Sequence, residues 1–126
     1  MAGPYHILVV DDEPMIRDIL RETLEQEGNR ITEAENGKVA CDAAAREQFD
    51  LIITDVKMPV MDGFTLMKNL GTVTEEVPVI VITSFSDIDV AVDAIRLGAY
   101  DYIVKPFNIS QVSLAVRRAL ERRRLL

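Results

Sequence analysis

Short apolar runs that each end in a polar residue constrain the fold of this chain most strongly. Four such runs lie at 7–10, 51–54, 79–82 and 102–104, and segments long enough for a helix separate them. Runs of this kind are typical of buried strands in a parallel sheet. An alternating segment, Arg-Ile-Thr-Glu-Ala, lies between the first two. The sequence therefore predicts five strands, near 6–10, 30–34, 51–54, 79–82 and 101–104.

Helical spacing of apolar residues fills the segments between these strands. Ile16, Ile19, Leu20 and Leu24 give the first of them a single apolar stripe, and Pro14 suits a first helical turn. Strands that alternate with helices form a parallel sheet with helices on both faces and right-handed connections. We expect the half-polar strand at 30–34 to lie at an edge. Helices are predicted near 14–26, 37–47, 63–70, 87–97 and 109–123.

Length and composition narrow the class of protein. The 126 residues suit one domain, and no apolar stretch approaches the roughly 20 residues of a membrane helix. The start of the chain lacks the features of a signal peptide, so a cytoplasmic protein that binds no membrane is expected. Cys41 is the single cysteine, which excludes an internal disulfide and favours a packing role. The net charge of −7 argues against nucleic-acid binding by this domain.

The polar residues that end the strands are the candidate functional residues. Asp11 and Asp12 follow the first apolar run, and Asp55, Thr83 and Lys105 follow the others. Ligands of parallel α/β sheets bind at the carboxyl ends of the strands. We therefore expect three carboxylates, a hydroxyl and an ammonium group to meet in one patch. Such a set is suited to a divalent cation and a phosphoryl group.

The carboxylates favour a metal ion. Asp11 and Asp12 could instead cap the first helix, a common role for Asp. However, two adjacent carboxylates that face a third repel one another, and a bound cation removes that conflict. Oxygen ligands suit Mg²⁺, or Mn²⁺ in its place. We expect a site that contains both residues and Asp55.

Asp55 is the candidate nucleophile, because a carboxylate can accept a phosphoryl group as an aspartyl phosphate. The metal and Lys105 would neutralise the phosphoryl oxygens, and Thr83 would offer them a hydroxyl. Taken singly, each has an ordinary interpretation: Asp55 as a turn former, Thr83 as a strand-end residue and Lys105 as a solvated lysine. Their common position at strand ends favours the chemical role.

Four segments resemble the receiver domain of two-component response regulators, from about residue 5 to residue 122. They are 9–14 (Val-Val-Asp-Asp-Glu-Pro), 53–63, which contains Asp55 and Met58-Pro59, 82–84 (Ile-Thr-Ser) and 98–107, which contains Lys105-Pro106. Each is modestly specific, and all four in this order are highly specific. The resemblance implies a doubly wound, flavodoxin-like sheet with strand order 2-1-3-4-5.

The resemblance also implies roles for individual residues. Asp55 would take the phosphoryl group from a phosphohistidine on a histidine kinase or histidine phosphotransfer protein. Asp12 would bind Mg²⁺ directly, Asp11 mainly through water, and Lys57 through its backbone carbonyl. The domain would then be a signalling element and not an enzyme, because it promotes only its own phosphorylation and dephosphorylation.

Further positions match the parts of the family that respond to phosphorylation. Lys105 would pair with the phosphoryl group, and the Lys105–Pro106 peptide would be cis. Thr83 and Tyr102 match the family's switch pair, in which the hydroxyl moves toward the phosphate and the ring turns inward. Lys57 and Phe85 occupy two positions that tune kinetics. Neither can orient a water as a carboxylate or amide would, so slow intrinsic dephosphorylation is expected.

The helix at 87–97 is apolar on two sides. One stripe holds Ile88, Ala91, Val92 and Ile95, and another holds Val90, Ala94 and Leu97. A surface helix needs only one buried stripe, so the other should be partly exposed and available to a partner. In the family, this helix, the strand 101–104 and the last helix often mediate regulated dimerisation or output contacts. A phosphorylation-dependent homodimer is the corresponding expectation.

Two alternative functions are less consistent with the sequence than a phosphorylated receiver. An aspartyl phosphatase of the haloacid dehalogenase type needs an Asp-x-Asp pair, whereas Lys57 stands two residues after Asp55. A receiver-like module that is never phosphorylated would not need the full set of site residues.

We expect one receiver domain over 1–126, with residues 1–4 outside the fold. Residues 120–126 would begin a connecting helix toward an output domain of DNA-binding or enzymatic type, although a free-standing receiver is also possible.

Overall fold

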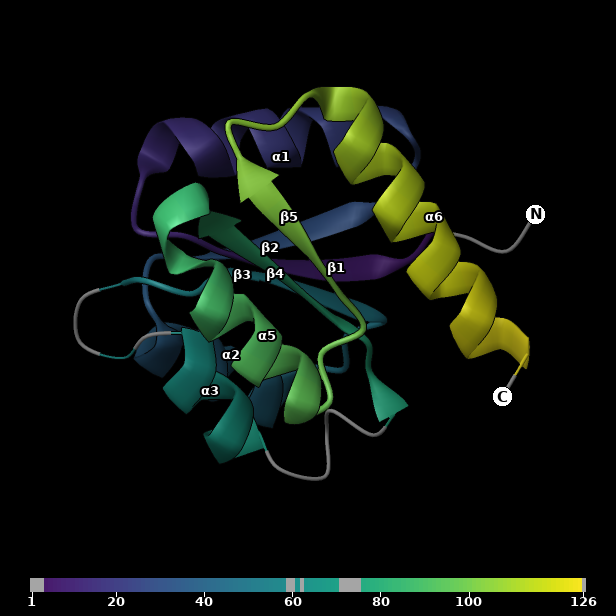
Figure 1. The fold of residues 1–126 in the computed structure, drawn as a ribbon. Helices are drawn as coiled ribbons and strands as arrows, with labels where there is room; N and C mark the ends of the chain where they lie inside the picture. Colours follow the sequence, from purple (N-terminus) through teal and green to yellow (C-terminus); the bar gives the residue numbers. More distant parts are fainter. Residues whose placement is uncertain (1–3, 59–60, 62, 71–75, 126) are drawn as a thin grey trace.

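The computed structural model describes residues 4–58, 61, 63–70 and 76–125. Its centre is a five-stranded parallel sheet in the order β2-β1-β3-β4-β5 (Figure 1). This confirms the predicted strand order and the position of the half-polar strand at an edge. The strands are β1 (His6–Val10), β2 (Arg30–Ala34), β3 (Leu51–Asp55), β4 (Val79–Ser84) and β5 (Asp101–Lys105).

Helices cover both faces of the sheet, as predicted. The helices α1 (Pro14–Gln26) and α6 (Ile109–Leu125) pack on one face (Figure 1). The helices α2 (Gly37–Arg46), α3 (Gly63–Leu70) and α5 (Ile88–Arg96) pack on the other. None of the helices within the described ranges is long and apolar enough to cross a membrane.

Strand alternation divides the core into two layers. Successive side chains of a strand point to opposite faces, so Ile7 and Val9 pack toward α1 and α6 whereas Leu8 and Val10 pack toward α2, α3 and α5. The three central strands are buried except at Ser84, the last residue of β4, which explains their continuous apolar sequences. In β2 only Ala34 is fully buried. Cys41, predicted to pack, contacts the second of these layers.

Near the site, three strands are longer than predicted, and α5 begins one residue later than predicted. Pairing continues through Asp55 with Ile82 and through Ser84 with Lys105, so these polar residues are still part of their strands. A short 3-10 turn over 85–87 follows β4, and α5 begins only at Ile88. The functional side chains are therefore fixed by sheet hydrogen bonds and not by a loose connection.

The structure corrects the grouping of apolar residues on α5. Ala91 and Ala94 are buried, although they were assigned to different stripes. Val92, Ile95 and Leu97 are 38–40% exposed. The two alanines line the side of the helix that lies against β4 and β5, and Val90 packs partly against the same core. The prediction that one apolar stripe is left partly exposed is confirmed, but its membership was wrong.

Candidate functional site

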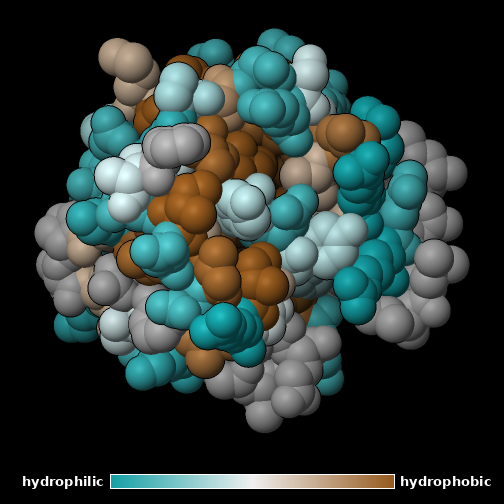
Figure 2. Space-filling view, viewed as in Figure 1, coloured by the Kyte–Doolittle hydropathy of each residue, from teal (hydrophilic) through white to brown (hydrophobic). Residues whose placement is uncertain are grey.

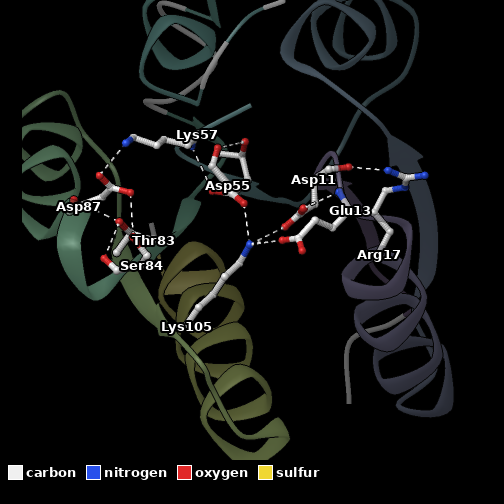
Figure 3. Close-up of polar contacts among 10 residues, drawn as sticks. Asp11, Glu13, Arg17, Asp55, Lys57, Thr83, Ser84, Asp87 and Lys105 are labelled. Carbon is white, nitrogen blue, oxygen red and sulfur yellow. Dashed lines mark hydrogen bonds and ion pairs between the residues drawn. The ribbon is translucent and has the colours of Figure 1, made fainter. Parts of the chain in front are cut away.

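The carboxyl ends of four adjacent strands, β1, β3, β4 and β5, carry Asp11, Asp55, Thr83 and Lys105 (Figure 3). Asp11 follows β1 directly, and the other three lie in the last two residues of β3, β4 and β5. The side chains of Asp11 and Thr83 are fully buried, and Asp55 is nearly so. The contacts of Lys105 bring Asp11 and Asp55 together as expected, and Thr83 lies on the strand next to that of Asp55.

Lys105 is the cationic centre of the site. Its Nζ lies 2.6 Å from Asp55 Oδ2, 3.0 Å from Glu13 Oε2 and 3.4 Å from Asp11 Oδ2. Burial alone would lower the pKa of Lys105, but its hydrogen bonds to Asp55 and Glu13 and the charges of Asp11 and Asp55 outweigh burial and raise that pKa. The side chain is therefore a permanent ammonium group that offsets part of the negative charge.

Asp11 carries the least satisfied polar atom of the site. Its Oδ1 accepts a hydrogen bond from the backbone N–H of Glu13 at 2.9 Å. Its buried Oδ2 has no hydrogen-bond partner among the described residues, and only the ion pair with Lys105 faces it. Burial is the main cause that raises the pKa of Asp11 to about 6. The hydrogen bond from the Glu13 N–H lowers this pKa, and the charge of Asp55 raises it further. A buried oxygen with this charge and no donor fits a cation ligand.

Four carboxylates form a group suited to a hard divalent cation. Asp11, Asp12, Glu13 and Asp55 each offer an oxygen, and these oxygens lie within 4.8 Å of one another. Mg²⁺ and Mn²⁺ prefer such oxygen ligands, so the residues fit the predicted ion. The helix-capping alternative is not realised, because the N-cap of α1 is Glu13. The backbone of Lys57 lies beside the Asp55 carboxylate, because its N–H donates to Asp55 Oδ1 at 3.1 Å.

The candidate switch residues have different surroundings. The Thr83 hydroxyl donates to the backbone carbonyls of Ser84 and Asp87, at 3.2 and 3.1 Å (Figure 3). Tyr102 lies on the surface of β5 and is partly exposed. Their role as a switch pair stays a prediction. The Lys105–Pro106 peptide is cis, as the resemblance implied.

Of the two kinetic positions, only Lys57 can be placed. Its side chain is 73% exposed, and its Nζ lies 3.1 Å from Asp87 Oδ1. The side chain of Phe85 lies outside the described residues, so its effect on kinetics stays a prediction.

Sequence reasoning missed the partners that connect these side chains. Glu13 binds Lys105, and Asp87 binds both Lys57 and Ser84. The third consecutive acid in Asp11-Asp12-Glu13 was a visible signal for the first. No comparable signal marked Asp87, because its contacts depend on the 3-10 turn after β4.

The fold and the site define a class: a doubly wound α/β domain with an acidic cation site and a lysine at the carboxyl ends of its strands. The family model described as the response regulator receiver domain matches residues 7–117. The chain therefore belongs to the receiver domains of two-component response regulators. Neither the phosphatase alternative nor the unphosphorylated module is favoured by this match.

Several relatives support this assignment. Sporulation initiation phosphotransferase F of Bacillus subtilis is 36% identical over 90% of this chain and 92% of its own length. The regulatory protein AtoC of Escherichia coli is 36% identical over 96% of this chain, which spans only 26% of AtoC. The crystal structure of the NtrX receiver domain from Brucella abortus is 38% identical, with a TM-score of 0.86 over 91% of this chain and 98% of that one.

Proposed function

We propose that Asp55 accepts a phosphoryl group from a phosphohistidine on a histidine kinase or phosphotransfer protein. The observation that carries this proposal is the 2.6 Å contact between Asp55 and Lys105 beside an acidic group in which Asp11 and Asp55 are buried. A carboxylate oxygen of Asp55 attacks phosphorus. The P–O bond forms as the donor's P–N bond breaks, and the imidazole leaves with the electron pair and takes a proton from solvent.

The surrounding residues reduce the electrostatic repulsion between the Asp55 carboxylate and the phosphoryl oxygens during this transfer. Lys105 binds the acceptor carboxylate and stays next to the phosphoryl oxygens, while the N–H of Lys57 holds Asp55 Oδ1. Asp11, Asp12 and Asp55, with the carbonyl of Lys57, would hold Mg²⁺, with Asp11 acting mainly through water. When bound, the ion supplies positive charge for the phosphoryl oxygens. Thr83 lies on β4, the strand that pairs with β3, and its hydroxyl would donate to one of these oxygens after reorientation.

A phosphoryl mimic tests this proposal without a kinase. Beryllofluoride with Mg²⁺ should bind the wild-type protein, detected as a bound ¹⁹F resonance, because it occupies the place of the phosphoryl group on a carboxylate. Binding should vanish without Mg²⁺ and in the Asp55→Asn variant, which keeps the size of the side chain. A bound signal that survives Asp55→Asn would contradict the assignment of the acceptor.

Dephosphorylation is expected to be slow. The Lys57 ammonium is directed toward Asp87, and it cannot accept a proton from an attacking water. The half-life of the phosphorylated protein, followed by intact mass after donor removal, should be minutes or longer. The variant Lys57→Asn, which places an amide two residues after Asp55, should shorten it. A wild-type half-life of only seconds would contradict this expectation.

The face formed by α5, β5 and α6 is the proposed output surface. Figure 2 shows apolar atoms gathered over this region, where Val92, Ile95, Tyr102 and Leu114 are each about two-fifths exposed. Acidic Asp93 and Asp101 and basic Arg96 and Arg118 flank the patch. An apolar patch with flanking charges of both signs is self-complementary and suits a two-fold homodimer.

Charge introduced into this patch should weaken dimerisation without preventing phosphorylation. Ile95→Asp should weaken self-association of the beryllofluoride-bound protein about tenfold or more, measured by sedimentation velocity, because a carboxylate would be desolvated at the interface. The matched control is Val39→Asp on α2, an apolar residue exposed to a similar extent on another face. Equal weakening by both variants would contradict a dimer interface on α5, β5 and α6.

We further propose that the receiver controls an output region in the whole protein. AtoC and the NtrC regulator of Escherichia coli are transcriptional or regulatory proteins of which the chain spans 26% and 24%. The helix α6 runs from Ile109 to Leu125, and residues 120–126 would lead toward that region. Residues 1–126 would act as one phosphorylation-controlled unit within it.

A further inference from the structure

Asp87 connects three residues of the acceptor site, although it is not one of the carboxylates that surround Asp55. Its Oδ2 accepts a hydrogen bond from Ser84 Oγ at 2.8 Å, and its Oδ1 lies 3.1 Å from Lys57 Nζ. Its backbone carbonyl accepts the hydrogen bond from Thr83 Oγ1. Figure 3 shows these contacts beside Asp55, on the side away from Lys105. One residue thus restrains the hydroxyl and the lysine that flank the acceptor.

The ion pair between Lys57 and Asp87 joins two separate segments. Lys57 follows β3, two residues after the acceptor, and Asp87 ends the 3-10 turn that follows β4. The Asp87 side chain is only 14% exposed, whereas that of Lys57 is 73% exposed. The Ser84 hydroxyl and then Lys57 lower the pKa of Asp87, so the carboxylate is ionised at neutral pH. The pair therefore holds the turn in place, and with it the backbone carbonyl of Asp87 that accepts the hydrogen bond from Thr83.

We propose that Asp87 is a positioning residue that holds the Thr83 hydroxyl and the Lys57 ammonium away from Asp55 in the unphosphorylated domain. The proposal rests on phosphoryl acceptance by Asp55. An aspartyl phosphate brings close to two negative charges into the site, about double that of a carboxylate. Lys57 is then drawn from Asp87 toward the phosphoryl group. Release of Asp87 loosens the turn, and the Thr83 hydroxyl can leave its carbonyl.

This arrangement makes the ion pair oppose phosphorylation. A contact present only in the unphosphorylated state must be broken when the phosphoryl group binds, so it lowers the population of the binding-competent state. Removing the contact should favour phosphoryl and beryllofluoride binding. The expected change is threefold to fivefold, because solvent screens a partly exposed ion pair and keeps its contribution small.

Asp87→Asn isolates the ion pair, since an amide oxygen can still accept from Ser84 and the backbone carbonyl is unchanged. Phosphorylation of Asp55 by acetyl phosphate at limiting concentration, followed by intact mass, should be three to five times faster than in the wild type. The affinity for beryllofluoride with Mg²⁺ should rise by the same factor. In a Lys57→Met background, the same substitution should change both quantities by less than about 1.5-fold, because the pair is already absent.

Controls separate this role from a structural one. Asp89→Asn removes the same charge from an exposed position on the first turn of α5 and should leave both quantities unchanged. Urea unfolding of Asp87→Asn reports any general loss of stability. If the wild type takes no phosphoryl group, the proposed function itself fails. If the wild type is phosphorylated and Asp87→Asn is no faster, or acts equally with and without Lys57, the positioning role is wrong.

Discussion

Replacing Lys105 with methionine should destabilise the metal-free protein by about 2–3 kcal/mol, since breaking a buried ion pair from one side typically costs about 3–5 kcal/mol and this ammonium is partly solvated. Lys105 contacts the carboxylates of Asp55, Glu13 and Asp11. Without it, two nearly buried carboxylates would face each other with no cation between them. The free energy of unfolding in urea measures the effect.

Magnesium should recover much of this loss, because a bound cation would take over the neutralisation of the same carboxylates. The variant should also lose the tight beryllofluoride binding of the wild type. Lys38→Met, which removes an exposed lysine on α2, should change stability by no more than about 0.5 kcal/mol. A Lys105→Met protein as stable as the wild type without metal would mean that the acidic group is already neutralised in another way.

Replacing Asp11 with asparagine should have the opposite effect on stability. The fully buried Asp11 Oδ2 has no donor among the described residues, and it faces the charge of Asp55. Asparagine keeps the acceptor for the Glu13 N–H and removes the buried charge, so the metal-free protein should gain about 1–2 kcal/mol. Calorimetric titration should show Mg²⁺ affinity reduced about tenfold or more, because an ionic ligand is lost. Stability and metal binding therefore oppose each other at this residue.

The pH dependence of that gain follows from the pKa of Asp11. Burial raises this pKa to about 6, above the value of about 4 in an unfolded chain. The folded state then binds the proton more tightly, so the wild type loses stability relative to the variant as pH rises from about 4 to 6. The gain from Asp11→Asn should be absent below pH 4 and complete above pH 6. Asp42→Asn, at an exposed position on α2, should show no such dependence. A gain from Asp11→Asn that is the same at pH 4 and pH 7 would contradict the buried-charge explanation.

The sequence was sufficient for the sheet and for the convergence of the site, because both follow from apolar runs and from what ends them. Asp11, Asp55, Thr83 and Lys105 were found because parallel strands present their carboxyl ends at one edge. The edge position of β2 followed from its half-polar pattern. These features depend on the pattern of neighbouring residues along the chain.

Features that depend on packing between elements could not be predicted. The division of α5 into a buried and an exposed side was wrong, because period alone does not show that Ala91 and Ala94 face the sheet together. The contact between Lys57 and Asp87 joins residues 30 positions apart, and its geometry depends on the turn after β4. The ion pair between Glu13 and Lys105 likewise joins residues 92 positions apart, from α1's N-cap to the end of β5.

The most direct test of the account is the intact mass of the protein after incubation with acetyl phosphate and Mg²⁺. We expect one added phosphoryl group on the wild type, lost in Asp55→Asn and in a metal-free sample. The adduct should be sensitive to hydroxylamine, as acyl phosphates are. If the wild type neither gains this mass nor binds beryllofluoride with Mg²⁺, or if Asp55→Asn gains the same mass, then Asp55 is not the phosphoryl acceptor.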